Sequence, residues 1–428
     1  MKQTSVKETA RKVKEDSFSM AALSEETRNQ ALSLMCEALD VHKEKIRLAN
    51  EQDLKEAEKQ QIPAPVLKRL KFDDAKREDV RSGIQSLISL ADPLSQTLLH
   101  RRLDDGLSLE KITCPIGVIG VIFESRPDAL VQIASLCLKS GNCAVLKGGS
   151  EAAHTNRALY EVISTAAKQA GIPEHFLTLL ESRSEIDELL GCDDSIDLLI
   201  PRGSNAFVQY IMEHSKIPVM GHADGVCHIY VDQDFDIKKA LPIILDAKTQ
   251  YTVACNSMET LLVHKDAAAA LLPKLSSMMQ EKSVLVKGDA TAQEYMDCSP
   301  AEEGDFGKEF SDLIFSVKVV TDLDEAISHI NRFGSHHTDC IITENKEAAD
   351  RFMLLVDSAG VYHNCSTRFA DGFRYGFGAE VGISTGKLHA RGPVGLDGLV
   401  TYKYRLSGGG HVVSDYAEGR RSFHFEDI

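Results

Sequence analysis

The sequence predicts an α/β fold, with a doubly wound parallel sheet followed by a second α/β unit. The first observation is that short apolar runs alternate with helical stretches, which is typical of parallel sheets covered by helices. The second is the run at 115–123, which contains no polar side chain, as in a strand buried on both faces. The third is size, because 428 residues with 43% apolar content are enough for two or three domains.

The elements follow in order along the chain. Residues 1–98 carry apolar side chains at spacings of three and four, which predicts an almost wholly helical region. An Asp-Gly pair within 99–112 indicates a β-hairpin. In the first α/β unit we predict strands at 115–123, 142–147 and 195–200 and helices at 128–140, 151–170 and 204–215. In the second, which extends to about residue 390, we predict a strand at 229–231, a helix at 236–249 and a strand at 258–264. The tail at 396–413 is strand-like and suited to extend a partner subunit's sheet together with the hairpin.

Composition excludes several classes of function. The net charge is −16, from 48 basic and 64 acidic residues, and there is no basic run, so we expect no nucleic-acid partner. No apolar stretch reaches the length of a membrane span and the N-terminus lacks an apolar segment, so we expect no membrane association and a cytoplasmic location. The cysteines form no Cys-x-x-Cys pair and the histidines no metal-binding spacing, which indicates free thiols and no metal. We interpret the adjacent His336 and His337 as surface histidines.

Cys255 is the candidate nucleophile. It lies between the predicted helix at 236–249 and the predicted strand at 258–264, followed by Asn256. A thiol in such a loop lies outside packed structure, where backbone N–H groups can receive a developing oxyanion. The alternative is an ordinary loop cysteine, which is the more common case for a lone cysteine.

Three strand-to-helix loops of the first unit are rich in glycine, serine and charged side chains. The candidate residues are Ser125 and Arg126 in the first loop, Lys147, Gly148, Ser150 and Glu151 in the second, and Arg202, Gly203 and Ser204 in the third. One such loop alone is an ordinary turn with a good helix cap. Three along one sheet edge predict a cofactor crevice at the carboxyl ends of the strands. Because the second strand ends in Lys147 and not in an acid, a cation is available for a ribose 2′-phosphate, which favours NADP(H) over NAD(H).

A glycine-punctuated segment at 376–393 is too irregular for a strand or a helix. Together with the run at 364–369 it is suited to form a pocket for an anionic substrate, and the alternative is a long surface loop. We divide the chain into a cofactor-binding domain (1–98 and 113–228), a catalytic domain (229–395) and a small β extension (99–112 and 396–428).

Several long motifs run in order from about residue 115 to 400: FESRPDA, LKGGSEA, PRGS, GHADGVCHIYVD, ACNSMETLLVH, NCSTRF and GAEVGISTGKLHARGPVGLDGL. They closely resemble the γ-glutamyl phosphate reductases, a family of the aldehyde dehydrogenase superfamily. The resemblance implies an aldehyde dehydrogenase-like fold, with a Rossmann-type NADP(H) domain, an α/β catalytic domain and a β oligomerisation extension, in a homodimer or homotetramer. It implies NADPH-dependent reduction of L-glutamyl 5-phosphate to L-glutamate 5-semialdehyde with release of phosphate, the second step of proline biosynthesis from glutamate. Functional coupling to glutamate 5-kinase follows from the same resemblance.

The resemblance also implies roles for residues. Cys255 matches the superfamily nucleophile, with its backbone N–H in the oxyanion hole, Lys147 matches the lysine at the adenosine ribose, and Asp312 falls where a glutamate contacts the nicotinamide ribose. Ser204 matches the serine that opens the helix on the pyrophosphate side. The candidates for substrate binding are Arg126, Asn364, Ser366, Arg368, Lys387 and Arg391, with Arg202 a further candidate for an anionic group. Which cation takes the phosphate and which the α-carboxylate stays open.

Two departures from the superfamily pattern bear on mechanism. Ser125 stands where the superfamily has an oxyanion-hole asparagine, and the loop at 220–225 lacks the glutamate that activates water. We therefore expect a thioester on Cys255 that is reduced by hydride and not hydrolysed. The alternatives are a non-phosphorylating aldehyde dehydrogenase, which needs that glutamate, and a catalytically inactive scaffold, which does not need the nucleophile and the cofactor loops.

Overall fold

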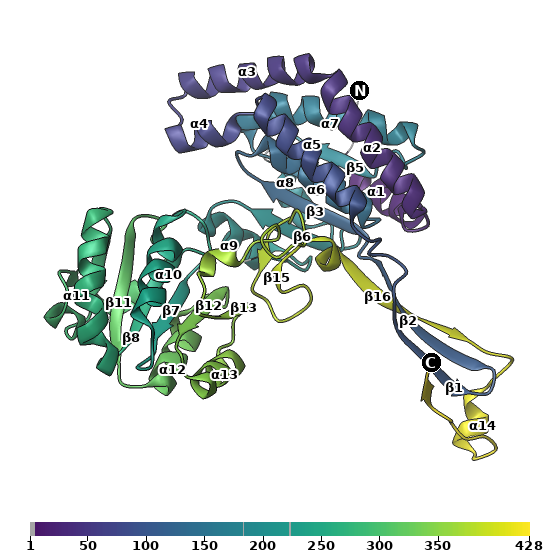
Figure 1. Cartoon of the computed structure of the whole chain (residues 1–428). Coiled ribbons are helices and arrows are strands. Elements are labelled where there is room, and N and C mark those ends of the chain that lie inside the picture. The colour runs from purple at the N-terminus through teal and green to yellow at the C-terminus, as the bar shows by residue number, and fades with distance from the viewer. Residues whose placement is uncertain (1–4, 183, 222–223) are drawn as a thin grey trace.

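The computed structural model describes residues 5–182, 184–221 and 224–428. A helical layer and a first parallel sheet lie together, a second parallel sheet with its own helices lies beside them, and a long antiparallel arm extends away (Figure 1). Among the helices of the described ranges, none combines the length and the apolar content that a membrane crossing requires.

The first sheet has the strand order β5-β4-β3-β6, and its neighbouring strands are parallel. The chain enters at the interior strand β3, continues outward through β4 and β5, and returns to β6 on the other side of β3. The loops after β3 and β6 therefore diverge at a topological switch point, where open α/β sheets bind ligands. The strands are β3 (Val118–Phe123), β4 (Cys143–Gly148), β5 (Leu177–Leu180) and β6 (Leu198–Arg202).

Helices of the N-terminal region and of the crossovers cover this sheet in one shared hydrophobic core. The N-terminal helices are α1 (Val6–Met20), α2 (Glu25–Val41), α3 (Lys43–Lys59), α4 (Ala64–Leu70) and α5 (Asp74–Ser89). The crossover helices are α6 (Pro127–Lys139), α7 (Ala153–Gln169) and α8 (Glu185–Leu190), and α9 (Asn205–His214) follows β6. Helix α2 packs against α5, α6 and α7, so the N-terminal helices belong to the same body as the first sheet.

The second sheet is parallel, with the strand order β10-β9-β11-β8-β7-β12-β13. Helices α10 (Ile237–Thr249) and α11 (Lys265–Glu281) pack in one core cluster, and α12 (Leu323–Phe333) and α13 (Lys346–Leu355) in another, so they cover opposite faces (Figure 1). The strands are β7 (Cys227–Val231), β8 (Met258–His264), β9 (Leu285–Gly288), β10 (Ser299–Pro300), β11 (Ile314–Val320), β12 (Thr338–Ile342) and β13 (Gly360–His363).

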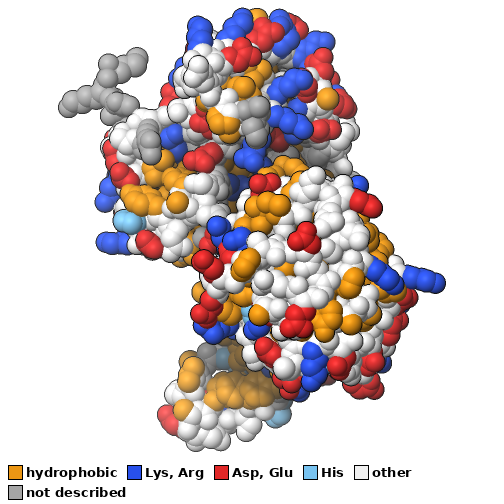
Figure 2. All heavy atoms as spheres, turned by 90° about the vertical axis from the view of Figure 1, so that its left-hand side faces the viewer, with side chains coloured by type: hydrophobic (Ala, Val, Ile, Leu, Met, Phe, Trp, Pro, Cys, Tyr) orange, Lys and Arg blue, Asp and Glu red, His pale blue; other side chains and the backbone are white. Residues whose placement is uncertain are grey.

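The arm is an antiparallel sheet of order β16-β2-β1-β17. Its members are β1 (Thr97–Asp104), β2 (Leu107–Pro115), β16 (Val400–Ser407) and β17 (Glu426–Asp427), with α14 (Val413–Ala417) before the last strand. Large hydrophobic side chains stay exposed on it, and Figure 2 shows such side chains gathered on the arm at the bottom of that view. They include Leu98, Tyr402, Tyr404, Leu406, Phe423 and Phe425.

Several predicted boundaries shift for local reasons. The strand predicted from 115 begins at Val118, because Pro115 still pairs with Val400 of the arm and Gly117 has a φ of 129°. The strand predicted at 195–200 lies at Leu198–Arg202, because the residues before it form a turn on Cys192. The helix predicted from 151 opens with a 3-10 turn, Ser150–Ala152, and the tail predicted as a strand from 396 begins with another, Leu396–Leu399.

Candidate active site

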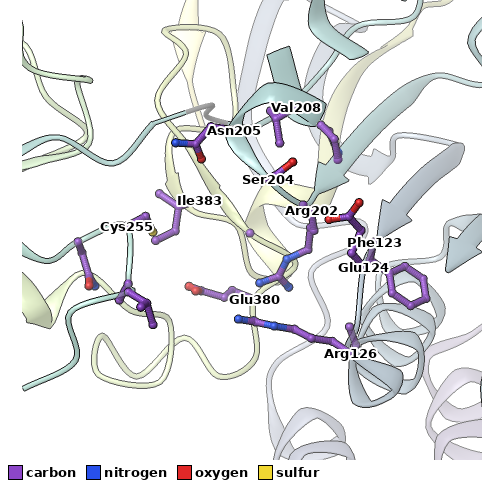
Figure 3. A pocket seen from close by; sticks show the side chains of 18 of the residues that line it. Phe123, Glu124, Arg126, Arg202, Ser204, Asn205, Val208, Cys255, Glu380 and Ile383 are labelled. Atoms are coloured by element: carbon purple, nitrogen blue, oxygen red, sulfur yellow. The ribbon is translucent and has the colours of Figure 1, made fainter. Parts of the chain in front are cut away.

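A cavity of about 750 Å³ lies between the two parallel sheets. The loops that follow β3 and β6 line one side of it, and the loop before β8 with two later segments of the chain lines the other. Figure 3 shows Arg126, Arg202, Ser204 and Asn205 reaching it from the first side, and Cys255 from the second.

The strand order explains why residues far apart in the sequence meet here. Strands β8, β7 and β12 are parallel neighbours, so the residues just before each of them lie on one edge of the sheet. Those residues include Cys255 before β8, Gly225 before β7 and His337 directly before β12. The second sheet thus contributes its amino edge to the cavity, whereas the first sheet contributes its carboxyl edge.

The Cys255 thiol lies next to a buried imidazole. His337 Nε2 is 3.2 Å from Cys255 Sγ, and His337 Nδ1 is 2.9 Å from Thr338 Oγ1. Cys255 is half-buried and His337 is 1% exposed. The prediction that His337 is a surface histidine is therefore wrong, because the residue stands at the start of an interior strand. This pairing gives the thiol a proton acceptor within hydrogen-bond reach.

The backbone of Cys255 packs tightly against Gly225. A Cβ placed on Gly225 would lie 2.5 Å from Cys255 Cα and 2.7 Å from its carbonyl carbon, and closer still to its carbonyl oxygen. That oxygen is 3.4 Å from the Cys227 thiol. Only glycine therefore fits position 225 without moving the nucleophile.

Asn256, the residue after the nucleophile, is buried and lines the cavity. Its Nδ2 donates to the carbonyl of Ala370 at 2.8 Å, and its own backbone carbonyl accepts from Thr367 Oγ1 at 2.7 Å. Its Oδ1 is buried without a hydrogen-bond partner among the described residues. Asn256 thus ties the nucleophile loop to the segment that follows β13.

Ser125 and Glu151 are bound to each other. The backbone N–H and the hydroxyl of Ser125 both donate to Glu151 Oε1, at 2.6 and 2.8 Å, and Ser125 has a positive φ of 50°. Glu151 therefore holds the Ser125 loop in a left-handed conformation, which costs free energy for a non-glycine residue. Both polar hydrogens of Ser125 point at a carboxylate, so Ser125 is not arranged as an oxyanion donor.

The other predicted cofactor residues fall into two groups. Arg202, Gly203 and Ser204 line the cavity, with Ser204 at the N-cap of α9. Within the described part of the chain, the Ser204 side chain makes no capping hydrogen bond to that helix. The second predicted loop, with Lys147, Gly148, Ser150 and Glu151, does not line the cavity. Lys147 is buried, and its Nζ is 2.5 Å from the Gly148 carbonyl oxygen.

The predicted substrate cations also separate. Arg126, Arg202 and Arg368 line the cavity. Burial and the neighbouring charge of Arg126 lower the pKa of Arg202, and burial and Arg374 lower the pKa of Arg368. Arg368 is buried, and its Nε donates to Gln250 Oε1 at 2.9 Å. Arg126 and Arg202 therefore attract anions from the side of the first sheet, and Arg368 attracts them from the side that carries the thiol.

The remaining predicted substrate residues lie outside the cavity. Lys387 and Arg391 both pair with Asp357, at 2.7 and 3.0 Å, and neither lines the cavity. Asn364 donates to the backbone carbonyl of Thr343 and accepts from its N–H. Ser366 caps a short 3-10 helix by accepting from the N–H of Arg368 at 3.3 Å.

Four acids of the cavity escaped the sequence analysis, namely Glu124, Glu309, Asp371 and Glu380. Glu309 lines the cavity, and its Oε2 accepts from Asn205 Nδ2 at 2.9 Å and from the N–H of Gly225 at 3.0 Å. The predicted Asp312, three residues later, is exposed and does not line it. Glu380 lines the cavity as well, and Figure 3 shows its carboxylate end directed toward the side of the cavity that carries Cys255. The sequence offers two acids in the run 309–312, Glu309 and Asp312. Only the fold shows that Glu309 is the one that lines the cavity.

A buried ion pair lies at the base of the nucleophile loop. Lys248 at the end of α10 and Glu259 in β8 are both fully buried, with Nζ 2.8 Å from Oε2. Burial raises the pKa of Glu259 to about 7 and lowers the pKa of Lys248. The loop that carries Cys255 runs from Lys248 to Glu259, so this ion pair joins the two ends of the loop.

Comparison with known proteins fits this geometry. The model of the aldehyde dehydrogenase family matches residues 1–296. A gamma-glutamyl phosphate reductase of Pelotomaculum thermopropionicum is 58% identical over 416 residues, covering 97% of this chain and 96% of the relative. One from Acetivibrio thermocellus is 56% identical, covering 98% of this chain and 97% of the relative.

Solved structures agree with these relatives. A crystal structure of gamma-glutamyl phosphate reductase from Thermotoga maritima matches with a TM-score of 0.93 and 38% identity, covering 96% of this chain and all of that chain. An acetylating aldehyde dehydrogenase from Geobacillus thermoglucosidasius shares the fold, with a TM-score of 0.65 at 16% identity over 95% of this chain and 97% of that one. The aldehyde dehydrogenase-like fold predicted from the motifs is confirmed. The chain belongs to the aldehyde dehydrogenase family and, within it, to the γ-glutamyl phosphate reductases.

Proposed function

We propose that the protein reduces L-glutamyl 5-phosphate to L-glutamate 5-semialdehyde with NADPH, releasing phosphate by way of a thioester on Cys255. The observation that carries the proposal is the Cys255 thiol, 3.2 Å from His337 Nε2, at a cavity lined by arginines. The relatives are named gamma-glutamyl phosphate reductases, which supports this reaction. In this proposal the domain of the first sheet binds the cofactor and the domain of the second sheet carries the nucleophile.

In the first step, the thiol transfers its proton to His337 Nε2 and the sulfur attacks the γ-acyl carbon of the substrate. The bond from that carbon to the phosphate oxygen breaks, and phosphate leaves with the electron pair. Arg126, Arg202 and Arg368 line the same cavity and attract the phosphate and the α-carboxylate. Cations that are already in place in a partly enclosed site stabilise the developing negative charge more than solvent would.

The residues present fit NADP(H). Helix α9 begins at the cavity with Ser204 and Asn205, and the N-terminus of a helix attracts phosphate groups. The Ser204 side chain makes no capping hydrogen bond to the described residues of α9. In this proposal its hydroxyl therefore donates to a phosphate group of the cofactor. Lys147 at the end of β4, where NAD-selective sites carry an acid, supports NADP(H) over NAD(H). When bound, the nicotinamide supplies a hydride to the thioester carbonyl carbon.

The chain's own groups then complete the reaction. The backbone N–H of Cys255 is the proposed donor to the oxyanion, and Ser125 is not, because its two polar hydrogens go to Glu151. When the oxyanion re-forms the carbonyl, the carbon–sulfur bond breaks and sulfur leaves with the electron pair. His337 returns the proton to the sulfur, so the thiol is ready for the next cycle.

The reverse reaction tests this proposal, because the acyl phosphate is labile. Purified protein is mixed with glutamate 5-semialdehyde and NADP⁺, with and without inorganic phosphate, and NADPH absorbance is followed. We expect a rate that requires phosphate and that Cys255→Ala abolishes. An equal rate without phosphate would establish a hydrolytic aldehyde dehydrogenase instead. That alternative lacks support in the sequence of the 220–225 loop, which holds no glutamate and of which His222 and Ala223 lie outside the described residues.

We further propose that the arm joins subunits into a homodimer or homotetramer. Its exposed aromatic and aliphatic side chains on β16 and near the C-terminus support this, because a monomer exposes few such clusters. Sedimentation of the wild-type chain and of a Tyr402→Ser, Tyr404→Ser variant tests it. We expect the variant to dissociate, and an unchanged assembly would exclude β16 as the contact.

A further inference from the structure

We propose that Glu380 binds the α-ammonium group of the substrate and so selects an α-amino acid aldehyde or acyl phosphate over its des-amino analogue. This inference rests on the proposed function and names what the site recognises beyond the reacting carbonyl. It makes Glu380 a specificity-determining residue.

The position of Glu380 supports this role. Its side chain lines the same cavity as Cys255, and Figure 3 shows its carboxylate end directed from the segment after β13 toward the Cys255 side of that cavity. Glu380 and Cys255 both act electrostatically on Arg202, in the direction that raises its pKa. The carboxylate and the sulfur therefore both lie near the same guanidinium group. The carboxylate therefore lies within the space that a substrate attached to Cys255 occupies.

The backbone holds this carboxylate in place. Glu380 Oε2 accepts from the N–H of Gly372 at 2.8 Å. A Cβ on Gly372 would lie 2.7 Å from the Gly378 carbonyl oxygen and 3.1 Å from Glu380 Oε2. A side chain at 372 would therefore displace this turn, which holds one oxygen of Glu380 at the cavity wall. A fixed carboxylate loses little freedom when it binds a cation.

Charge complementarity identifies what the carboxylate binds. The proposed substrate carries two anionic groups, the phosphate and the α-carboxylate, and one cationic group, the α-ammonium. Arginines alone would accept any acyl phosphate that bears a carboxylate, so recognition of the ammonium requires an acid.

The other acids of the cavity have roles of their own. Glu309 accepts from Asn205 and from the Gly225 N–H, and Asp371 accepts from the N–H groups of Phe373 and Arg374. Glu124 lies against Gly203 at the end of β3, on the proposed cofactor side. Glu380 is the cavity acid whose charge acts on Arg202, one of the proposed substrate arginines.

The test compares two aldehydes in the phosphate-dependent reverse reaction with NADP⁺: glutamate 5-semialdehyde and 5-oxopentanoate, which lacks the amino group. For wild type we expect kcat/KM to favour the amino aldehyde by about 100-fold, the worth of a charge-assisted contact of roughly 3 kcal/mol. In Glu380→Gln we expect most of that preference to vanish, with little change for 5-oxopentanoate, and Glu380→Asp to restore part of it.

Alternative outcomes are separable. If Glu380 only offsets repulsion between Arg126 and Arg202, Glu380→Gln will change both aldehydes by the same factor, and the inference falls. If Glu380→Gln does not fold, as judged by thermal unfolding and NADPH binding, Gly372→Ala shifts the carboxylate without removing it. We expect that variant to lose rate selectively with the amino aldehyde, and an equal loss with both contradicts the inference. A wild type that oxidises neither aldehyde in a phosphate-dependent manner refutes the proposed function itself.

Discussion

Replacement of Gly225 by alanine tests how the fold positions the nucleophile. The new Cβ would lie 2.5 Å from Cys255 Cα and 2.7 Å from its carbonyl carbon, whereas ordinary contacts begin near 3.4 Å. Neither side can yield easily, because both are backbone: Gly225 donates its N–H to Glu309, and the Cys255 carbonyl faces the Cys227 thiol. The two segments must therefore separate by about 1 Å.

The consequence for catalysis follows from that displacement. A shift of about 1 Å in a reacting group lowers the rate by roughly 100-fold, because attack requires close and oriented approach. The overpacking costs about 1–3 kcal/mol of unfolding free energy. We expect kcat of Gly225→Ala to fall on the order of 100-fold, with NADPH affinity nearly unchanged, since the groups proposed to bind the cofactor lie on the first sheet.

The assay is steady-state turnover together with denaturant unfolding and the rate of Cys255 alkylation. Gly221→Ala is the matched control, because Gly221 lines the same cavity but its Cβ would be 3.8 Å from the nearest atoms, in Pro201. We expect this control to stay within about threefold of wild type. A folded Gly225→Ala enzyme with wild-type kcat would refute the reasoning, since it would mean that the nucleophile loop tolerates the displacement.

Four further predictions concern the thiol and the groups behind it. Cys255→Ala should abolish turnover while NADPH fluorescence still reports binding, and residual turnover would exclude the thioester. His337→Gln should lower kcat by about 100-fold or more and slow alkylation of Cys255 by iodoacetamide, and an unchanged alkylation rate would mean that the imidazole does not activate the thiol. Lys248→Met should cost about 3–5 kcal/mol, measured by urea unfolding, because it leaves Glu259 buried without its partner. In wild type, burial raises the pKa of Glu259 to about 7. Between pH 4.5 and about pH 7 the folded protein therefore keeps a proton on Glu259 that the unfolded chain has released. Wild-type stability should therefore fall relative to Glu259→Gln as pH rises from about 4.5 to about 7, and a pH-independent difference would contradict this.

The sequence predicted best the features that are local to a strand or a loop. Of the apolar run predicted at 115–123, the part Val118–Phe123 is a strand buried at every position, and the segment at 258–264 is a strand with the predicted bounds. Cys255 was recognised because a helix, a thiol and a strand follow one another within a few residues. Such patterns depend on side-chain periodicity and turn chemistry, which short windows contain.

The features that the sequence did not predict depend on strand order. His337 was taken for a surface residue because nothing near it in the chain indicates that β12 lies beside β7 in the sheet interior. Lys387 and Arg391 resembled a substrate site by charge alone, but Asp357, some thirty residues earlier, binds both. Charge and spacing identify candidates, and only the tertiary partners decide which of them face a ligand.

The use of opposite edges by the two sheets has a mechanistic consequence. The first sheet offers its carboxyl edge, where the N-terminus of α9 suits phosphate groups. The second offers its amino edge, so Cys255 and His337 precede their strands and are fixed by the sheet that follows them. The groups proposed to bind the cofactor and those proposed to activate the thiol therefore rest on separate hydrophobic cores, and a change at the start of β12 should alter the thiol without altering the proposed cofactor groups. In the proposed reaction, the relative position of the two sheets then determines whether the hydride donor reaches the thioester.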